Sequence, residues 1–262
     1  MLNKIIRSAA LLALLTFVCA SQSFAAGVFY PGEELEYEVS FLGVKLGSIK
    51  MYSERVETMD GKKTYKSKAL IDSYKGIPFV DLHAVFESWM DPSLAFSHKF
   101  AGNQKVDDKT WAYQKFYFDY SKGVIKNQKW LNRELVYEND LKFANKCNDG
   151  NSLFFFARQY VDSKKSAKAP TIVDKEVGYT YINFYGKREK VEIDAIDYPV
   201  RTIYFDGRID WQGVYGLKGK FQGWFSDDEA RIPIKAKMNV YVGNVVIELV
   251  KWKRPGWTPP KG

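Results

Sequence analysis

The chain has few of the residues that cross-link folds or bind metals. Its 262 residues include two cysteines and two histidines, and Cys19 lies close to the N-terminus. If the N-terminal segment is removed, Cys147 has no partner for an internal disulfide, so the fold must depend on its core. His83, His98 and Cys147 are too few and too widely spaced for a zinc site. We therefore predict no metal and no cofactor.

Motifs of common enzyme classes are also missing. The sequence contains neither a G-x-x-x-x-G-K-[ST] phosphate loop nor a G-x-S-x-G nucleophile elbow. Cys147, in a loop before a helix-like segment, is the one thiol nucleophile, and either histidine would have to serve as its base. These absences favour a non-catalytic protein and leave an enzyme as the alternative.

Long apolar runs are absent except near the N-terminus. Lys4 and Arg7 precede an apolar stretch over 9–18, and small residues follow up to Ala25 and Ala26. A basic part, a short apolar part and a small-residue site together are typical of a cleavable secretory signal. The run is shorter than the roughly 20 residues that span a bilayer, which argues against a membrane anchor.

We predict a signal peptide over residues 1–25, with cleavage after Ala25 or after Ala26, and a periplasmic mature chain over 26–262. Lipidation at Cys19 is the alternative, but Val18 precedes this cysteine where a small residue is required. Cys19 is therefore interpreted as part of the removed peptide.

Aromatic residues are abundant, with 18 Phe, 17 Tyr and 7 Trp, and they favour half-buried sheet surfaces. Leu35, Tyr37 and Val39 alternate with glutamates, and residues 111–120 alternate again before a turn into 124–130. We predict a mainly β fold, an antiparallel meander that curls into an open barrel or a two-layer sheet.

One segment breaks the alternation and predicts a single short helix near 152–162. Asp149, Asn151 or Ser152 would cap it, and Leu153, Phe156, Ala157 and Tyr160 would share its apolar face. A loop over 162–170 would follow. The helix and loop would join two halves of one domain, about 28–145 and 171–253.

The second half is predicted to begin with strands over 171–177, 179–185, 187–196 and 200–205, separated in part at Gly178 and Gly186. Strands over 221–226, 232–241 and 245–252 would follow. An internal similarity also appears between residues 89–96 and 224–231. Each begins with tryptophan and reads as a strand, an acidic turn and a strand. Two related halves would explain this similarity, and independent convergence of two hairpins is the alternative.

Three stretches together carry a family resemblance: Gly32 to Ser40 with Gly43 to Gly47, Asp149 to Arg158, and Trp224 to Pro233 with Gly243 and Ile247 to Leu249. In that order they resemble DUF3108, a family of exported bacterial proteins of unknown function. The resemblance implies export and a mainly antiparallel β architecture. It supplies no catalytic residues.

The aromatic surplus is the strongest functional clue. A sheet that is apolar on both faces must cover both, for example by curling around a cavity. We expect an apolar or amphipathic envelope component, such as a lipid, to bind the concave face. The candidate ligand-binding residues are Trp89, Trp111, Trp224, Phe156 and Tyr160.

Two alternatives remain open. The acidic hairpin residues Asp91, Asp227, Asp228 and Arg231 would serve a glycan-active hydrolase, and an envelope assembly scaffold is the other alternative. The net charge of +8 is scattered along the chain. It fits peripheral membrane association, but neither the charge distribution nor export favours a nucleic-acid partner.

Overall fold

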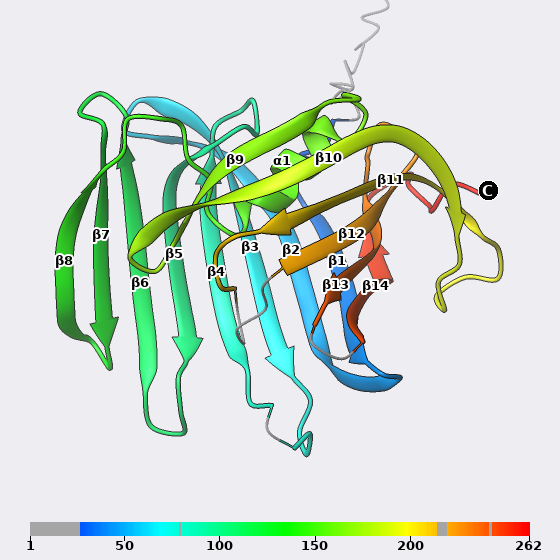
Figure 1. Cartoon of the computed structure of the whole chain (residues 1–262), viewed down its shortest axis with the longest axis horizontal. Helices are drawn as coiled ribbons and strands as arrows, with labels where there is room; N and C mark the ends of the chain where they lie inside the picture. Colours follow the sequence, from blue (N-terminus) through cyan, green and yellow to red (C-terminus); the bar gives the residue numbers. More distant parts are fainter. Residues whose placement is uncertain (1–26, 79, 214–218, 241–242) are drawn as a thin grey trace, which may run out of the picture.

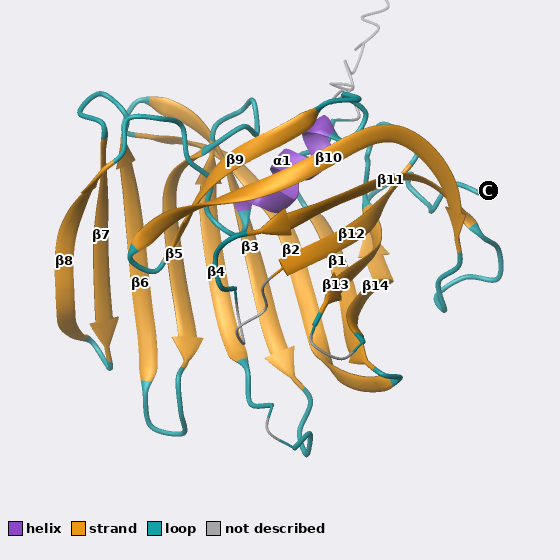
Figure 2. Cartoon of the chain, in the orientation of Figure 1, coloured by secondary structure: helices purple, strands orange, loops and turns teal. Residues whose placement is uncertain are grey.

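The computed structural model describes residues 27–78, 80–213, 219–240 and 243–262, and the predicted signal peptide with its cleavage sites lies outside them. Within this part of the chain, fourteen strands and one helix, α1 (Ser152–Tyr160), are formed (Figures 1 and 2). In chain order the strands are β1 (Glu33–Phe41), β2 (Val44–Met59), β3 (Lys62–Ser73), β4 (His83–Met90), β5 (Ser97–Lys105), β6 (Trp111–Asp119), β7 (Val124–Leu131), β8 (Glu134–Lys142), β9 (Ser166–Val173), β10 (Glu176–Val191), β11 (Val200–Ile209), β12 (Gly219–Ser226), β13 (Pro233–Asn239) and β14 (Asn244–Lys253).

All fourteen strands belong to one antiparallel sheet. Its order is β8-β7-β6-β5-β4-β3-β2-β1-β14-β13-β12-β11-β10-β9. Strands that are neighbours in sequence therefore pair, except β8 and β9, and the first strand pairs with the last. In that pairing Leu35 lies opposite Trp252 and Val39 opposite Ile247. The predicted antiparallel meander is confirmed, and β1–β14 joins its two halves into one continuous sheet.

The sheet curls into an open barrel whose edges are β8 and β9 (Figure 1). The turn between β9 and β10 bridges the gap between these edges through Asp174. Its backbone carbonyl accepts hydrogen bonds from Gln114 (2.7 Å) and Asn127 (2.6 Å), and its carboxylate pairs with Lys129 (2.8 Å). These side-chain contacts, together with the backbone bridge between Asn148 and Thr171 on β9, connect the two sides of the open sheet.

Helix α1 lies inside the curl, between strands β9 to β11 and strands β2 to β4 (Figure 2). Phe155 is almost fully buried in the largest apolar cluster, with Leu35, Met90 and Ile234. On the other side, Ala157 packs in a second cluster, formed mainly by β10, β11 and β12. The predicted helix is confirmed, but both of its sides are covered instead of a single apolar face.

Several predicted boundaries in the second half are wrong. The expected loop over 162–170 already contains the first residues of β9, and the expected strand 171–177 includes the β9–β10 turn. Gly178 and Gly186 lie within β10 instead of ending strands. Gly186 has φ +66° at an irregularity in the pairing with β11, so it bends the strand without ending it.

The alternation did not predict β8. Its side chains are exposed or partly exposed on both faces, so no apolar periodicity marks it.

Helix α1, the helix that the described residues form, is too short to cross a membrane.

Candidate functional site

A cavity of about 720 Å³ occupies the interior of the curled sheet. Its walls come from the inward faces of β1 to β6 on one side and from β9, β11, β13 and β14 on the other. Most of the lining is aliphatic or phenyl, including Val39, Ile49, Ile71, Phe86, Phe116 and Ile247. The period-two alternation of each strand turns these side chains inward.

Helix α1 and the turn before it close one end of the cavity. Phe154 and Asn151 line this end, and the Asn151 side-chain amide donates a hydrogen bond to Ser67 on β3 (2.9 Å). Ala69, Ile71 and Ser73 then line the cavity along β3. The cavity therefore runs along this strand for roughly 13 Å, given about 3.3 Å per residue.

Gly102 gives the cavity part of its width. It lies between Phe100 and Gln104 on the inward face of β5, where a Cβ atom would be 2.9 Å from the Phe86 ring and 3.1 Å from the Phe100 ring. The two rings stack with their centroids 5.8 Å apart. Glycine is thus required for two phenyl rings to form this wall together.

The other end of the cavity, here called the mouth, is more polar. It lies where β3 and β5 end and where the segment after β11 begins. Polar side chains from several strands and loops reach the cavity here or at its β9–β10 side: Asp72, Ser73, Gln104, Lys129, Asp174 and Gln212. The site thus combines an apolar interior with polar groups at its margin.

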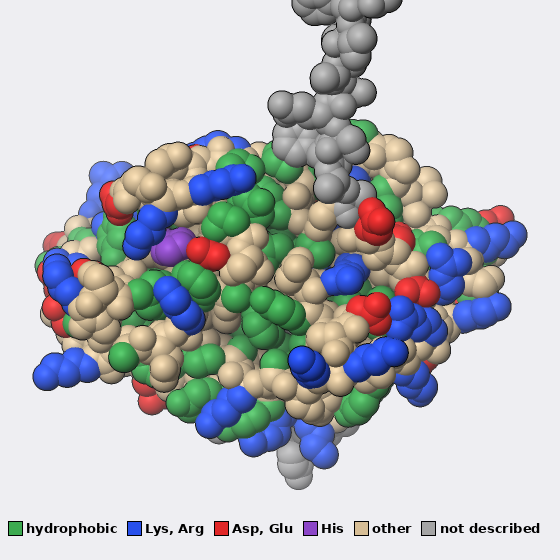
Figure 3. Space-filling view, turned by 90° about the horizontal axis from the view of Figure 1, so that it is seen from above, with side chains coloured by type: hydrophobic (Ala, Val, Ile, Leu, Met, Phe, Trp, Pro, Cys, Tyr) green, Lys and Arg blue, Asp and Glu red, His purple; other side chains and the backbone are tan. Residues whose placement is uncertain are grey.

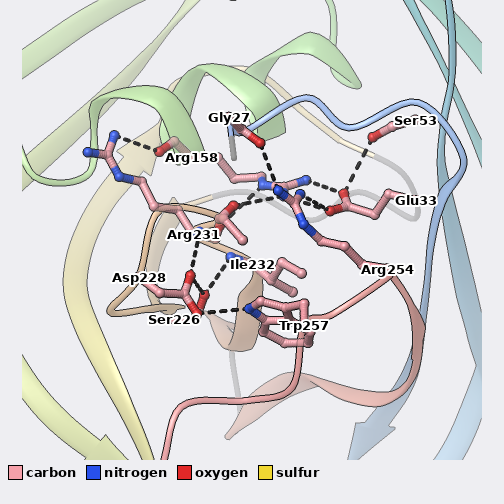
Figure 4. A network of polar contacts seen from close by, with 11 residues as sticks. Gly27, Glu33, Ser53, Arg158, Ser226, Asp228, Arg231, Ile232, Arg254 and Trp257 are labelled. Carbon is pink, nitrogen blue, oxygen red and sulfur yellow. Dashed lines mark hydrogen bonds and ion pairs between the residues drawn. The ribbon is translucent and has the colours of Figure 1, made fainter. Parts of the chain in front are cut away.

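Buried charges anchor the helix end (Figure 4). Arg158 on α1 and Glu33 on β1 form a two-pronged ion pair with distances of 2.7 and 3.2 Å, and both side chains are almost completely buried. Arg254, after β14, donates a further hydrogen bond of 2.6 Å to Glu33. This cluster connects the helix to the junction where the first and last strands pair.

Further donors of the two arginines bond to backbone carbonyls. Arg158 donates to the backbone carbonyls of Ala230 (2.9 Å) and Arg231 (3.2 Å), and Arg254 donates to that of Gly27 (3.0 Å). Burial alone would raise the pKa of Glu33, but the two guanidinium groups outweigh it and hold the pKa below its usual value. Glu33 is therefore an ionised carboxylate with cations on two sides.

Glu33 and Arg158 lie within the motifs that carry the family resemblance, but the sequence alone assigned neither residue a role. The signal that was missed is an arginine directly after the inward-facing Ala157 on an otherwise apolar helix. A charge at such a position must be paired, because burial of an unpaired charge is very costly.

Asp149 supports the start of the helix. Its carboxylate accepts hydrogen bonds from the backbone N–H groups of Asn151 and Ser152, both at 2.8 Å, and from the hydroxyls of Ser88 and Ser97, both at 2.6 Å. Burial raises the pKa of this carboxyl, and the four hydrogen bonds oppose that effect. Of the three predicted caps, Asp149 carries the contacts to the first backbone N–H groups.

None of the five predicted ligand-binding residues is among the described residues that line the cavity. Trp89 and Trp224 instead occupy equivalent places in two hairpins. The Trp89 indole donates a hydrogen bond to Glu57, two strands away, and Trp224 donates to Glu189 (2.6 Å), also two strands away. Lysine chains lie over both indole rings.

The equivalence extends to the strand register. Glu57 lies opposite Thr64, and Glu189 lies opposite Thr202. In each pair the threonine hydroxyl donates to the glutamate backbone carbonyl, at 3.1 and 2.8 Å. The two hairpins that are similar in sequence therefore also have matching contacts.

The other three predicted residues are dispersed. Trp111 is exposed on β6, beside Tyr113 and Trp130. Phe156 and Tyr160 pack against the second apolar cluster, with their ring centroids 4.8 Å apart. On the helix, Phe154 faces the cavity instead.

The acidic hairpin residues each have structural partners. Asp227 forms ion pairs with Arg188 (3.3 Å) and Arg201 (3.2 Å). Asp228 accepts hydrogen bonds from the Arg231 backbone (3.0 Å) and the Trp257 indole (2.8 Å), as Figure 4 shows. These contacts define an ordered turn.

The remaining two candidates also have contacts within the fold. Arg231 donates to the carbonyl of Gln159 (2.6 Å) near the C-terminal end of α1. Asp91 accepts hydrogen bonds from the backbone and hydroxyl of Ser93, at 3.0 and 2.6 Å. Cys147 is fully buried, and burial raises the pKa of its thiol, so the thiolate needed for nucleophilic attack is disfavoured.

The fold and cavity define a β-barrel-like protein with an open sheet and a helix at one end of an apolar interior. The model of the DUF3108 family, described as a protein of unknown function, matches residues 36–250, and the chain belongs to this family. No curated protein matches the sequence.

Three solved structures are similar. A β-barrel-like protein of the DUF1849 domain of unknown function from Brucella abortus has a TM-score of 0.53 at 11% identity, covering 84% of this chain and 96% of that chain. This likeness shows the fold alone. A candidate exported protein with a YmcC-like fold from Bacteroides fragilis has a TM-score of 0.36 at 8% identity, covering 87% of this chain and 100% of that chain. A candidate lipoprotein from Parabacteroides distasonis has a TM-score of 0.35 at 9% identity, covering 87% of this chain and 98% of that chain.

Proposed function

We propose that this protein binds an apolar or amphipathic envelope component, such as the acyl chain of a lipid, without catalysing a reaction on it. The observation that carries the proposal is the apolar cavity of about 720 Å³, closed at one end by α1. Its volume lies in the range of roughly 300–1,000 Å³ that is typical of small-molecule sites. Residues of the cavity wall, rather than the five predicted aromatic residues, would contact the ligand.

The shape and lining of the cavity favour an elongated ligand. Transfer of a methylene group from water into an apolar site contributes roughly 0.8 kcal/mol, so a buried chain of about ten methylenes would gain roughly 8 kcal/mol before ordering costs. A polar head group would lie at the mouth, near Asp72, Gln104 and Gln212.

We further propose that the protein acts in the periplasm. The three-part N-terminal pattern of the sequence supports export. The proposed site supports this location as well, because membranes enclose the periplasm and supply ligands with acyl chains. Fractionation of cells that express the full chain, followed by N-terminal sequencing of the mature protein, tests export and the cleavage site together.

The binding proposal is tested by native mass spectrometry and lipid extraction on protein purified from the periplasm. A retained lipid would support a carrier or a sensor. Binding is then measured in vitro with cis-parinaric acid, because Trp211 lines the cavity and would transfer excitation energy to this fluorescent fatty acid. A protein that retains no lipid and does not bind the probe would contradict the proposal.

A pair of adjacent substitutions provides a matched control. Ile71 lines the cavity, whereas Leu70, its neighbour on β3, does not. We expect Ile71→Trp to fill the cavity and weaken probe binding by roughly tenfold or more. Leu70→Trp adds the same side chain on the opposite face of the strand and should leave probe binding within about twofold of wild type.

A further inference from the structure

Exposed large apolar side chains are concentrated at the mouth end of the molecule. Leu42 is 69% exposed in the β1–β2 turn, Val106 58% exposed in the β5–β6 turn, and Leu135 54% exposed beside the β7–β8 turn. Val44, Tyr74 and Val136 are also exposed at this end. Scattered exposed apolar residues are ordinary, but a group gathered at one end indicates an interaction surface.

The topology of the sheet explains why these residues lie at the same end of the molecule. In an antiparallel meander, successive turns alternate between the two ends of the sheet. The β1–β2, β3–β4, β5–β6 and β7–β8 turns therefore lie at the same end, along the lower edge of Figure 1. The cavity opens at this end as well, because Leu46, Ser73 and Gln104 line it there.

Leu42 occupies a backbone position that folding alone would not assign to leucine. Leu42 and Gly43 are the two central turn residues, with φ +48° and +81°. Two-residue hairpin turns of this kind favour Asn-Gly or Asp-Gly, because positive φ is costly for a bulky side chain. An exposed leucine here adds no core contact, so its side chain is available to contact something outside the molecule.

Aromatic and basic side chains flank the apolar tips. Trp111 and Tyr113 are exposed at the lower part of β6, and the Tyr113 ring lies 5.3 Å from that of Trp130. Arg133, in the β7–β8 turn, forms no ion pair among the described residues. Tryptophan and tyrosine with nearby cations are typical of the interface between water and a lipid head-group layer.

We propose that the mouth rim, defined as Leu42, Val44, Tyr74, Val106, Leu135 and Val136, docks on the surface of a lipid membrane. The cavity mouth would then face the bilayer, from which an acyl chain enters. This inference rests on the proposed function, since it names the source of the ligand. Asp107 and Asp108 lie beside Val106, so apolar contact contributes more than net charge.

The test is flotation of the mature protein with vesicles of phosphatidylethanolamine and phosphatidylglycerol. The variant Leu42→Ser/Val106→Ser/Leu135→Ser replaces three exposed apolar side chains of the mouth rim and leaves the core unchanged. We expect the wild type to float with the vesicles and the variant to bind roughly tenfold or more weakly. Equal flotation of the two proteins, or no flotation of the wild type, would overturn the proposal.

Val56 and Tyr185 provide the control, because they are exposed apolar residues away from the mouth rim. Val56→Ser/Tyr185→Ser should float as the wild type does. If it loses binding as strongly as the rim variant, the association is non-specific adhesion and the docking surface is refuted.

Leu42→Asn makes the sharpest test, because the two expected effects have opposite signs. Asparagine suits positive φ, so thermal stability should be unchanged or higher, while vesicle binding should fall about threefold. Weaker binding together with a lower melting temperature would instead indicate a structural role. Uptake of cis-parinaric acid is measured separately. A protein that does not bind a ligand in its cavity is thereby distinguished from one whose mouth rim does not bind membranes.

Discussion

The two ends of the barrel distribute polar and apolar groups in opposite ways. At the helix end, Arg158, Glu33 and Asp149 are buried and satisfied by hydrogen bonds. At the mouth end, Leu42 and Val106 are apolar and exposed. Seen from the helix end, charged and hydrophobic side chains are interspersed (Figure 3). The difference indicates that the helix end stabilises the fold, whereas the exposed apolar residues of the mouth end form the proposed docking surface.

The largest expected effect on stability comes from removing the buried ion pair at the helix end. Arg158→Ala leaves the buried Glu33 carboxylate without its two-pronged partner, which should lower the free energy of unfolding by about 3–5 kcal/mol. Arg188→Ala is the control, since Arg188 also contacts two carboxylates but its side chain is 41% exposed. Because these ion pairs of Arg188 are exposed, Arg188→Ala should lower the free energy of unfolding by at most about 1 kcal/mol. Urea denaturation measures both, and similar losses would contradict the assignment.

The next comparison uses two adjacent phenylalanines on α1. Phe155 is buried in the core, and its replacement by alanine should cost about 3–5 kcal/mol. Phe154 borders the cavity, so Phe154→Ala should cost only about 1–2 kcal/mol. It should also change the affinity for cis-parinaric acid, because it enlarges the closed end. Denaturation and probe titration of both variants provide the readout.

The smallest effects concern pH, and they should differ in sign between two carboxyls. The pKa of Glu33 is lowered in the fold, so its ionised form contributes stability above the pKa of the unfolded chain. This contribution is lost as the pH falls through the lowered pKa. The difference in unfolding free energy between wild type and Glu33→Gln should therefore shrink below about pH 4.5.

Asp149 should behave in the opposite way, because burial raises its pKa. Its protonated form contributes stability below the pKa of the unfolded chain, and this is lost as the pH rises through the raised pKa. The stability of wild type relative to Asp149→Asn should therefore fall with rising pH. Urea titrations between about pH 3 and pH 7 test both trends, and parallel trends would refute the distinction.

The local pattern predicted much of the fold. Alternation in β1 and β6, the turn between residues 120 and 124 and the break in period before α1 are properties of short segments. An antiparallel meander depends mainly on such segments, because nearly every strand pairs with its neighbour in sequence. Strand β8 was not predicted, since both of its faces are exposed.

The sequence predicted the chemical character of the candidate site but not the residues that line it. The sequence favoured an apolar concave face, but it indicated Phe156 and Tyr160 where the structure places Phe154. Alternation shows that two faces of a strand differ without showing which one faces inward when both carry aromatic rings. Trp89 illustrates this, because its indole is covered by lysine chains outside the cavity.

The amino-acid sequence by itself thus determined most of the strands, helix α1 and the antiparallel order, because these depend on contacts between neighbouring segments. Tertiary structure alone decided which faces line the cavity and why Arg158 and Glu33 are buried together. Those features require the pairing of β1 with β14 and the curl of the sheet. Both join residues that are far apart in the chain, and no local pattern records them.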